Sequence, residues 1–279
     1  MKFSSLLSSI ILLLGMGTQL SQAQGITGRA YYKSSSQFKI SMDSTQMPPE
    51  QMAEIQAQLK KQMEKDYILS FTQTESNWKQ AESLGGGPAT ASSGGMTMVI
   101  NTGSQDRLLY KNIADQSFLQ EEDMMGKEFL VQDILEPAEW ELTGETKKIG
   151  NYTAQKATYS RIVDGKRFST GMTEMENVKD TISVTAWFTP EIPVSHGPEN
   201  FFGLPGLILE LQNQGMTLIC DKIELNPSAN PVQIEKPKRG KIVSREEFRA
   251  VQDESMKQMM NQYQGKPGSG SQFTIRIGN

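Results

Sequence analysis

The sequence predicts a mainly β protein of the α+β class, with a curved antiparallel sheet or half-barrel and two amphipathic helices. Three observations favour this class. Short segments with alternating apolar and polar residues follow one another closely from Tyr67 onward. Only two segments show the three-to-four-residue apolar repeat of an amphipathic helix. Because few helices separate the strands, antiparallel pairing is favoured over β-α-β units.

The first 23 residues have the three-part layout of a secretory signal peptide. A cationic start at Met1-Lys2 precedes an apolar stretch from Leu6 to Leu14, and Ser21 and Ala23 place small residues at the −3 and −1 positions. This stretch is far shorter than the ~20 residues of a membrane-spanning helix, and no later segment is apolar enough to span a bilayer. We therefore expect export, cleavage after Ala23, and a single β-rich domain at residues 24–279 in the periplasm or outer cell envelope.

The two predicted helices lie near the ends of the mature chain. The first begins at Pro49, because proline suits a first helical turn, and extends to about Lys65. The second begins after Ser244, a favourable N-cap residue, and extends to about Tyr263. We expect residues 264–279 to form a tail that ends in a short strand or a frayed terminus.

Glycine and proline mark the expected turns. The glycine-rich segment 85–95 is expected to be a flexible loop at the tip of a hairpin. Asp164-Gly165, between two strand-like runs, predicts a tight hairpin turn. Pro205-Gly206 suits the centre of a type II turn, in which the glycine adopts a positive φ. The strand that follows, Leu207 to Leu211, is expected to pair with Met216 to Leu225.

Composition argues against several kinds of chemistry. The net charge of −4 offers no basic surplus for nucleic-acid binding. Cys220 is the only cysteine, so no intramolecular disulfide forms, and its strand-like surroundings favour a small buried residue over a reactive thiol. His196 is the only histidine, and we expect it to be an exposed loop residue. One histidine and one cysteine are too few for the usual zinc site, and no cofactor is expected.

Catalytic motifs are equally sparse. Neither a glycine-rich phosphate-binding motif nor a GxSxG nucleophile turn occurs. A hydrolase would have to use a pair such as Glu191 and Glu199, together with His196, but acidic residues in loops are usually solvated. We therefore expect no catalytic residues, and an unrecognised hydrolase is kept as an alternative.

Methionine is unusually frequent, with 16 residues. Met256, Met259 and Met260 would share one face of the second helix. Thioethers are ligands for Cu(I), so a copper site at these three residues is a second alternative. Methionine also fills irregular gaps and lines adaptable apolar grooves, and this interpretation is favoured. Such a groove, between a curved sheet and its helices, would bind a lipid, a peptide or a partner protein without chemistry.

One segment carries a specific resemblance to a known family. It contains Trp187-Phe188-Thr189, Ile192-Pro193, Gly197-Pro198 and the run from Phe202 to Glu210. With Gly203-Leu204-Pro205-Gly206-Leu207-Ile208 at its centre, it resembles the signature of the GLPGLI family, and the stretches Tyr67 to Phe71 and Ile149 to Ala157 are similar as well. The signature turn, which is also a candidate binding rim, comprises Pro193, Gly197, Pro198, Gly203, Leu204, Pro205, Gly206, Leu207 and Ile208.

The resemblance implies a cellular context rather than an activity. GLPGLI proteins are exported proteins of Bacteroidetes-type bacteria, and many are encoded beside TonB-dependent outer-membrane receptors. The family has no established activity or catalytic residues, and many members carry a cysteine near the position of Ala154, which this chain lacks. The expected shape is similar to that of LolA-type lipoprotein carriers. The leading hypothesis is a non-catalytic envelope protein that binds a ligand or partner and is accessory to a TonB-dependent transporter.

Overall fold

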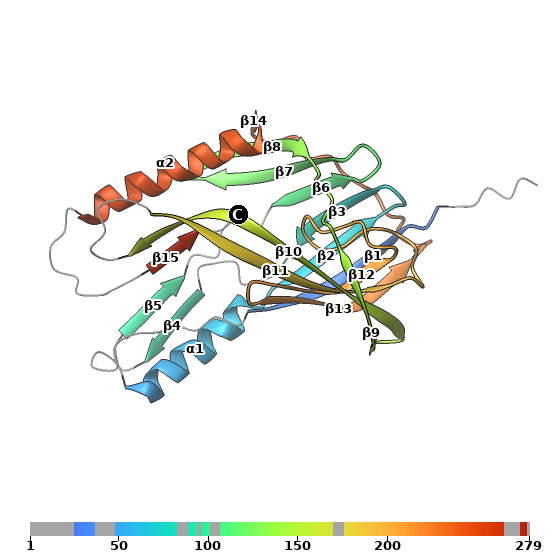
Figure 1. Ribbon diagram of the computed structural model, residues 1–279, viewed down its shortest axis with the longest axis horizontal. Helices are drawn as coiled ribbons and strands as arrows, with labels where there is room; N and C mark the ends of the chain where they lie inside the picture. Colours follow the sequence, from blue (N-terminus) through green and yellow to red (C-terminus); the bar gives the residue numbers. More distant parts are fainter. Residues whose placement is uncertain are drawn as a thin grey trace, which may run out of the picture.

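The computed structural model describes residues 25–36, 48–82, 89–93, 96–100, 107–169, 176–264 and 274–277. The predicted signal peptide, and most of the predicted tail, lie outside these residues. Within the described part of the chain, one large open sheet dominates the molecule and two helices accompany it (Figure 1).

The large sheet has thirteen strands. In chain order they are β1 (Gly28–Ser36), β2 (Asp66–Phe71), β3 (Glu75–Gln80), β6 (Leu108–Asn112), β7 (Ser117–Met124), β8 (Lys127–Ile134), β9 (Glu141–Ile149), β10 (Tyr152–Ser169), β11 (Glu176–Thr189), β12 (Leu207–Asn213), β13 (Met216–Leu225), β14 (Lys241–Val243) and β15 (Thr274–Ile277). Their order across the sheet is β14-β8-β7-β6-β3-β2-β1-β13-β12-β11-β10-β15, and β9 pairs with β10. All pairs are antiparallel except β14 with β8. The predicted fold class is confirmed.

Alternate residues of the central strands point to one buried face. Ala30 and Tyr32 of β1, and Leu69 and Phe71 of β2, are at most 1% exposed. This period of two is the one that the sequence pattern predicts. β12 is buried on both faces along most of its length and pairs with β13 in the predicted hairpin. The hairpin therefore lies within the core, where the Tyr32 hydroxyl donates a hydrogen bond of 2.6 Å to the carbonyl of Ile208.

Both described helices, α1 (Pro49–Met63) and α2 (Arg245–Gln264), lie where the apolar repeat predicts them. α2 begins with a capping box. The Ser244 hydroxyl accepts a 3.1 Å hydrogen bond from the N–H of Glu247, whose carboxylate accepts one of 2.7 Å from the N–H of Ser244. Phe248 in the first turn packs edge-on against Phe129 of β8, with ring centroids 5.4 Å apart. α2 therefore covers the β8 end of the sheet (Figure 1).

The hairpin turn predicted at Asp164-Gly165 is wrong. β10 continues through both residues and pairs with β11, so that Asp164 lies opposite Lys179 and Gly165 opposite Val178. The turn preference of this dipeptide is a local term. Cross-strand pairing acts along the whole length of the two strands and outweighs it.

The flexible loop predicted at residues 85–95 is wrong over residues 89–93. These residues form β4 (Ala89–Ser93), which pairs with β5 (Met96–Ile100) in a separate two-stranded sheet beside α1 (Figure 1). The side-chain amide of Gln62 donates to the backbone of Thr90 at 2.6 Å and accepts from it at 2.8 Å, and Gln58 bonds Ser92 likewise at 3.2 and 3.1 Å. Gln58 and Gln62 are four residues apart on the helix, a rise of ~6 Å, and Thr90 and Ser92 are two residues apart on the strand, a rise of ~6.6 Å. Because these two spacings are nearly equal, each glutamine amide can bond the backbone of β4 in the way that a neighbouring strand would.

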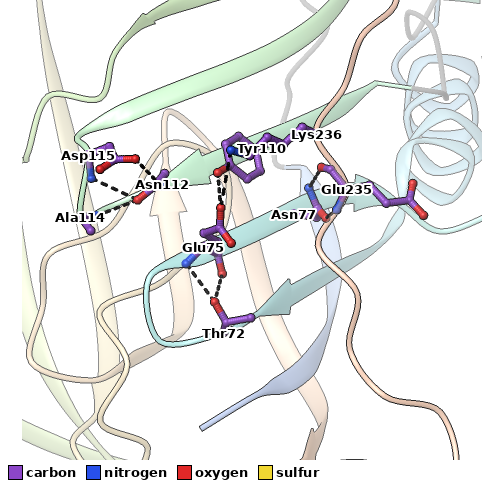
Figure 2. A network of polar contacts seen from close by, with 9 residues as sticks. All are labelled: Thr72, Glu75, Asn77, Tyr110, Asn112, Ala114, Asp115, Glu235 and Lys236. Atoms are coloured by element: carbon purple, nitrogen blue, oxygen red, sulfur yellow. Dashed lines mark hydrogen bonds and ion pairs between the residues drawn. The ribbon is translucent and has the colours of Figure 1, made fainter. Parts of the chain in front are cut away.

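An extended segment at residues 226–240 connects β13 to β14 across the outer face of the sheet. Asn77 of β3 forms two hydrogen bonds with the backbone of Glu235, both of 2.7 Å (Figure 2). Beside this contact, the ammonium of Lys236 lies 5.1 Å from the ring centroid of Tyr110 on β6 (Figure 2). Asn77 and Tyr110 are buried, 6% and 2% exposed, so the segment is held against the sheet by two covered side chains.

The signature hexapeptide forms a turn of a different kind from the one predicted. The N–H of Gly206 donates to the carbonyl of Leu204 at 2.8 Å, which makes a three-residue γ-turn centred on Pro205. The positive φ falls at Gly203, at +93°, and not at Gly206. The type II prediction is therefore wrong, and the role of Gly206 is steric. A Cβ at this position would lie 2.1 Å from the carbonyl oxygen of Thr189.

We expect Gly206→Ala to lower the free energy of unfolding by about 3 kcal/mol, because the added methyl group overpacks the site against backbone that cannot rotate away. Urea unfolding measures the change. Gly25→Ala is the matched control, because a Cβ there meets no atom within 4 Å, and it should change stability by less than about 0.5 kcal/mol. Equal stabilities of the two variants would contradict the steric role of Gly206.

Candidate ligand-binding cavity

A cavity of about 510 Å³ lies between the two ends of the sheet and α2. Its wall comes from β7 and β8 on one side and from β10, β11 and the end of β12 on the other, with α2 and the loop after β11 completing it. β7 and β10 stand far apart in the strand order but line the same cavity, so the sheet curves around it. The volume lies in the range of small-molecule binding sites.

The loop after β11 brings Glu199, Asn200 and Phe201 into the cavity wall. Lys111 of β6 holds this loop from the core side. Its ammonium nitrogen donates to the carbonyl of Gly197 at 2.7 Å, to the carbonyl of Phe201 at 3.4 Å, and to the carbonyl of Glu199. An ammonium has three donors, so one buried side chain can satisfy three carbonyls and fix the course of the loop.

Glu199 and Lys111 perturb each other's protonation inside the protein. Burial lowers the pKa of the Lys111 ammonium to about 7, although the Glu199 carboxylate opposes this shift. Burial also raises the pKa of the Glu199 carboxyl, while Lys111 and Arg107 lower it. Glu199 further adopts a φ of +50°, which is uncommon for a residue other than glycine and recurs at functional sites. A carboxyl group with a perturbed pKa in a cavity is a candidate functional group.

Other charged side chains give the cavity wall both signs of charge. Glu122 of β7 pairs with Arg107 at 3.1 Å, and burial raises the pKa of its carboxyl while Arg107 lowers it. On α2, Arg245 lies 3.9 Å from the Glu136 carboxylate and 4.9 Å from the ring centroid of Phe118. The carboxylates of Glu122 and Glu136 thus come from β7 and from the segment after β8, while guanidinium groups of the wall come from α2 and β10.

Amide side chains add hydrogen-bonding groups to the wall. Gln120, Asn200, Asn213, Gln214 and Gln252 all line the cavity. The Oδ1 atom of Asn213 is buried and has no hydrogen-bond donor within the described part of the chain. Buried polar atoms of this kind are rare in folded proteins. This one is closed to solvent, so the amides that a ligand in the cavity would meet are the others of the wall.

The prediction of an exposed His196 is wrong. Its side chain is 0% exposed, with its ring centroid 6.3 Å from that of Phe71. Neither ring nitrogen has a hydrogen bond of good geometry, although the nearby backbone of Thr72 and Gln73 favours the charged ring. Burial, together with Lys111, lowers the imidazole pKa to about 3. His196 is therefore a neutral packing residue, in a loop that lies against the core instead of in solvent.

The nine residues of the predicted signature turn lie beside the cavity, and none of them lines it. Leu204, Leu207 and Ile208 are buried in the core, whereas Pro193 and Pro205 are exposed. The three residues that do line the cavity, at positions 199–201, lie between Pro198 and Gly203. The signature residues therefore flank and position a short loop that reaches the cavity.

The remaining candidate residues of the sequence analysis are Glu191, Cys220 and the three methionines of α2. Glu191 is exposed and accepts a 2.8 Å hydrogen bond from the N–H of Thr153, so it does not share the cavity with Glu199. Cys220 is buried, as predicted, and burial raises its thiol pKa to about 12. The side chains of Met256, Met259 and Met260 lie outside what the structure describes, although their backbone belongs to α2.

Sequence reasoning missed Lys111, Glu122 and the cavity arginines. A signal for Lys111 was present, because it alternates in phase with the buried Leu109 along β6. A lysine at an inward position of a strand requires a partner inside the protein. The arginines carry no such signal, because nothing in their spacing reveals that α2 packs against β8.

The described residues contain no group of three or more His, Cys, Asp or Glu side chains arranged to hold a metal ion. Neither described helix has the length and hydropathy required to span a membrane.

We expect His196→Leu to protect the protein against acid. The folded imidazole pKa of about 3 lies below the ordinary value of 6.5, so the unfolded chain takes up a proton first as the pH falls, and stability is lost from about pH 6.5 toward pH 3. The wild type should lose about 3 kcal/mol from this group between pH 6.5 and pH 4, and the variant should not. Urea unfolding at both pH values measures the difference.

The comparisons with known proteins bear on this region. Residues 140–210, which include the loop at 199–201, match a family model described as a protein of unknown function, Porph_ging. Two structures of PNGF-II, in C2 and P21 crystals, resemble 82% of the chain at 13% and 14% identity, with TM-scores of 0.46 and 0.44. The chain spans about a third of the length of those two structures, and a likeness at this level carries no argument about function. No curated protein matches the chain. Residues 140–210 thus resemble a domain family whose function is unknown.

Proposed function

We propose that the chain is a non-catalytic binding protein of the cell envelope, and that its cavity takes a short peptide or a ligand of similar polarity. The observation that supports this is the cavity of about 510 Å³ with hydrogen-bonding and charged groups in its wall. The loop at residues 199–201, within the region that matches the family model, contributes to that wall.

The chemistry of the wall favours a peptide over a lipid. Aromatic side chains, among them Phe118, Tyr159 and Phe201, offer apolar contact, while the amides and charges lie between them. An acyl chain would remove those polar groups from water without giving them partners, which is costly. A peptide supplies both N–H and C=O groups, so it satisfies the wall groups that it desolvates.

The location and the partner extend the proposal. The signal peptide that the sequence predicts at residues 1–23 supports export to the periplasm or the outer cell envelope. The resemblance to the GLPGLI family supports a role as an accessory to a TonB-dependent outer-membrane transporter, to which the protein would deliver or present its ligand.

We expect a mixture of short peptides to bind the mature wild-type protein in isothermal titration calorimetry, and palmitate not to bind. Gln252→Trp should weaken peptide binding at least about tenfold, because an indole on this side of α2 would fill part of the cavity. Gln258→Trp is the matched control, since it lies on the same helix but outside the cavity wall. Binding of palmitate, with no peptide bound, would reject the proposed ligand class.

We expect the mature protein to begin at Gln24 and to fractionate with the cell envelope. Mass spectrometry of the N-terminal peptide and fractionation of cells that express the full chain measure both. A tagged mature protein should then retain a TonB-dependent receptor from solubilised envelope. An uncleaved chain in the cytosol would count against export, and the absence of any receptor would count against the accessory role.

A further inference from the structure

Three charged groups of the cavity wall have neither a side-chain hydrogen bond nor an ion pair within the described part of the chain. The Glu122 and Glu136 carboxylates are paired with Arg107 and Arg245, as described above. The Glu199 carboxylate, by contrast, has no hydrogen bond or ion pair there, because the ammonium of Lys111 is bonded to backbone carbonyls. The other two groups are guanidiniums, and they lie elsewhere in the wall.

Arg161 of β10 and Arg249 of α2 also line the cavity and have no ion pair or hydrogen bond with a described residue. Both side chains are exposed, so they lie at the mouth, whereas Glu199 is partly buried. The charges that act on the Glu199 carboxyl are those of Lys111 and Arg107, and neither mouth arginine is among them. Glu199 and the two arginines thus stand in different parts of the wall, on the loop after β11, on β10 and on α2. Arg249 also acts on the Asp133 carboxylate through its charge.

This separation determines which ligand the cavity would complement. A neutral ligand would give none of the three charged groups an ion pair, and a singly charged ligand would leave one end of the cavity without one. A cube of this volume is ~8 Å on a side, which accommodates about two to three residues of extended chain. The amide side chains of Gln120, Asn200 and Gln252 line the same cavity and offer hydrogen-bonding groups to the backbone of such a chain.

We propose that the ligand is a zwitterionic di- or tripeptide, whose amino group binds Glu199 and whose terminal carboxylate lies between Arg161 and Arg249. This inference rests on the proposed function, because it names the ligand class of the same cavity. The amino group enters first and the carboxylate stays at the mouth. The aromatic side chains of the wall contact the peptide between its two ends.

The test uses four forms of one peptide, alanyl-phenylalanyl-alanine: free, N-acetylated, C-amidated and capped at both ends. We expect acetylation to weaken binding to the wild type about tenfold, because it removes a charged hydrogen bond inside the protein. We expect amidation to weaken binding about threefold, because exposed ion pairs contribute less. Isothermal titration calorimetry of the mature protein measures all four affinities.

Two variants test which residues bind the amino end and the carboxylate end of the peptide. Glu199→Gln should lose the preference for a free amino group and keep the preference for a free carboxylate, with Glu191→Gln, which lies outside the cavity, as control. The double variant Arg161→Gln, Arg249→Gln should show the reverse, with Arg239→Gln, whose partners are Glu121 and Glu128, as control.

The outcomes separate the two proposals. If the wild type binds none of the four peptides, the proposed peptide-binding function fails. If it binds all four equally, the function stands and the zwitterion inference is overturned. If Glu199→Gln weakens all four forms by the same factor, Glu199 supports the loop and does not contact the ligand, which also overturns the inference.

Discussion

The ammonium group of Lys111 joins two parts of the chain that are far apart in sequence, and the cavity depends on this contact. Its three donors bind three carbonyls in the loop at residues 197–201, so the loop is fixed to β6 from inside the core. Burying an amine is costly unless it is hydrogen-bonded, and the lowered pKa of Lys111 reflects that cost. The cost is offset because three loop carbonyls, which a buried loop would otherwise leave without donors, are satisfied by one side chain.

The signature hexapeptide at residues 203–208 fixes the C-terminal end of the same loop. Gly206 allows the γ-turn to pass directly against the carbonyl of Thr189, and Leu207 then enters a strand that is buried on both faces. The loop is thus held between β6 on one side and the start of β12 on the other. The family-matched region thereby combines a rigid hexapeptide, which provides architecture, with the three residues at 199–201, which provide the cavity wall.

Patterns with a single dominant period could be predicted from the sequence, whereas features that depend on long-range packing could not. The repeat of α1, the Ser244 cap and the hairpin after Leu207 each follow from nearby residues. The prediction at Asp164-Gly165 was wrong because pairing with β11 outweighs the local preference of this dipeptide for a turn. The prediction at His196 was wrong because burial against Phe71 outweighs the preference of a loop histidine for solvent. The cavity could not be predicted, because its wall joins β7, β10 and α2, which meet only once the whole sheet has curved.

The hydrogen bonds of Lys111 also explain why the Glu199 carboxyl group has no hydrogen bond or ion pair within the described part of the chain. If this ammonium were paired with the Glu199 carboxylate, the two charges would neutralise each other and the loop carbonyls would lose their donors. Because Lys111 bonds the carbonyls instead, it acts on the Glu199 carboxylate only through its charge, and the carboxylate keeps its hydrogen-bonding capacity. One buried side chain therefore fixes the loop and leaves the Glu199 carboxylate without a hydrogen bond, so that the amino group of the proposed peptide would not compete with the contacts that stabilise the loop.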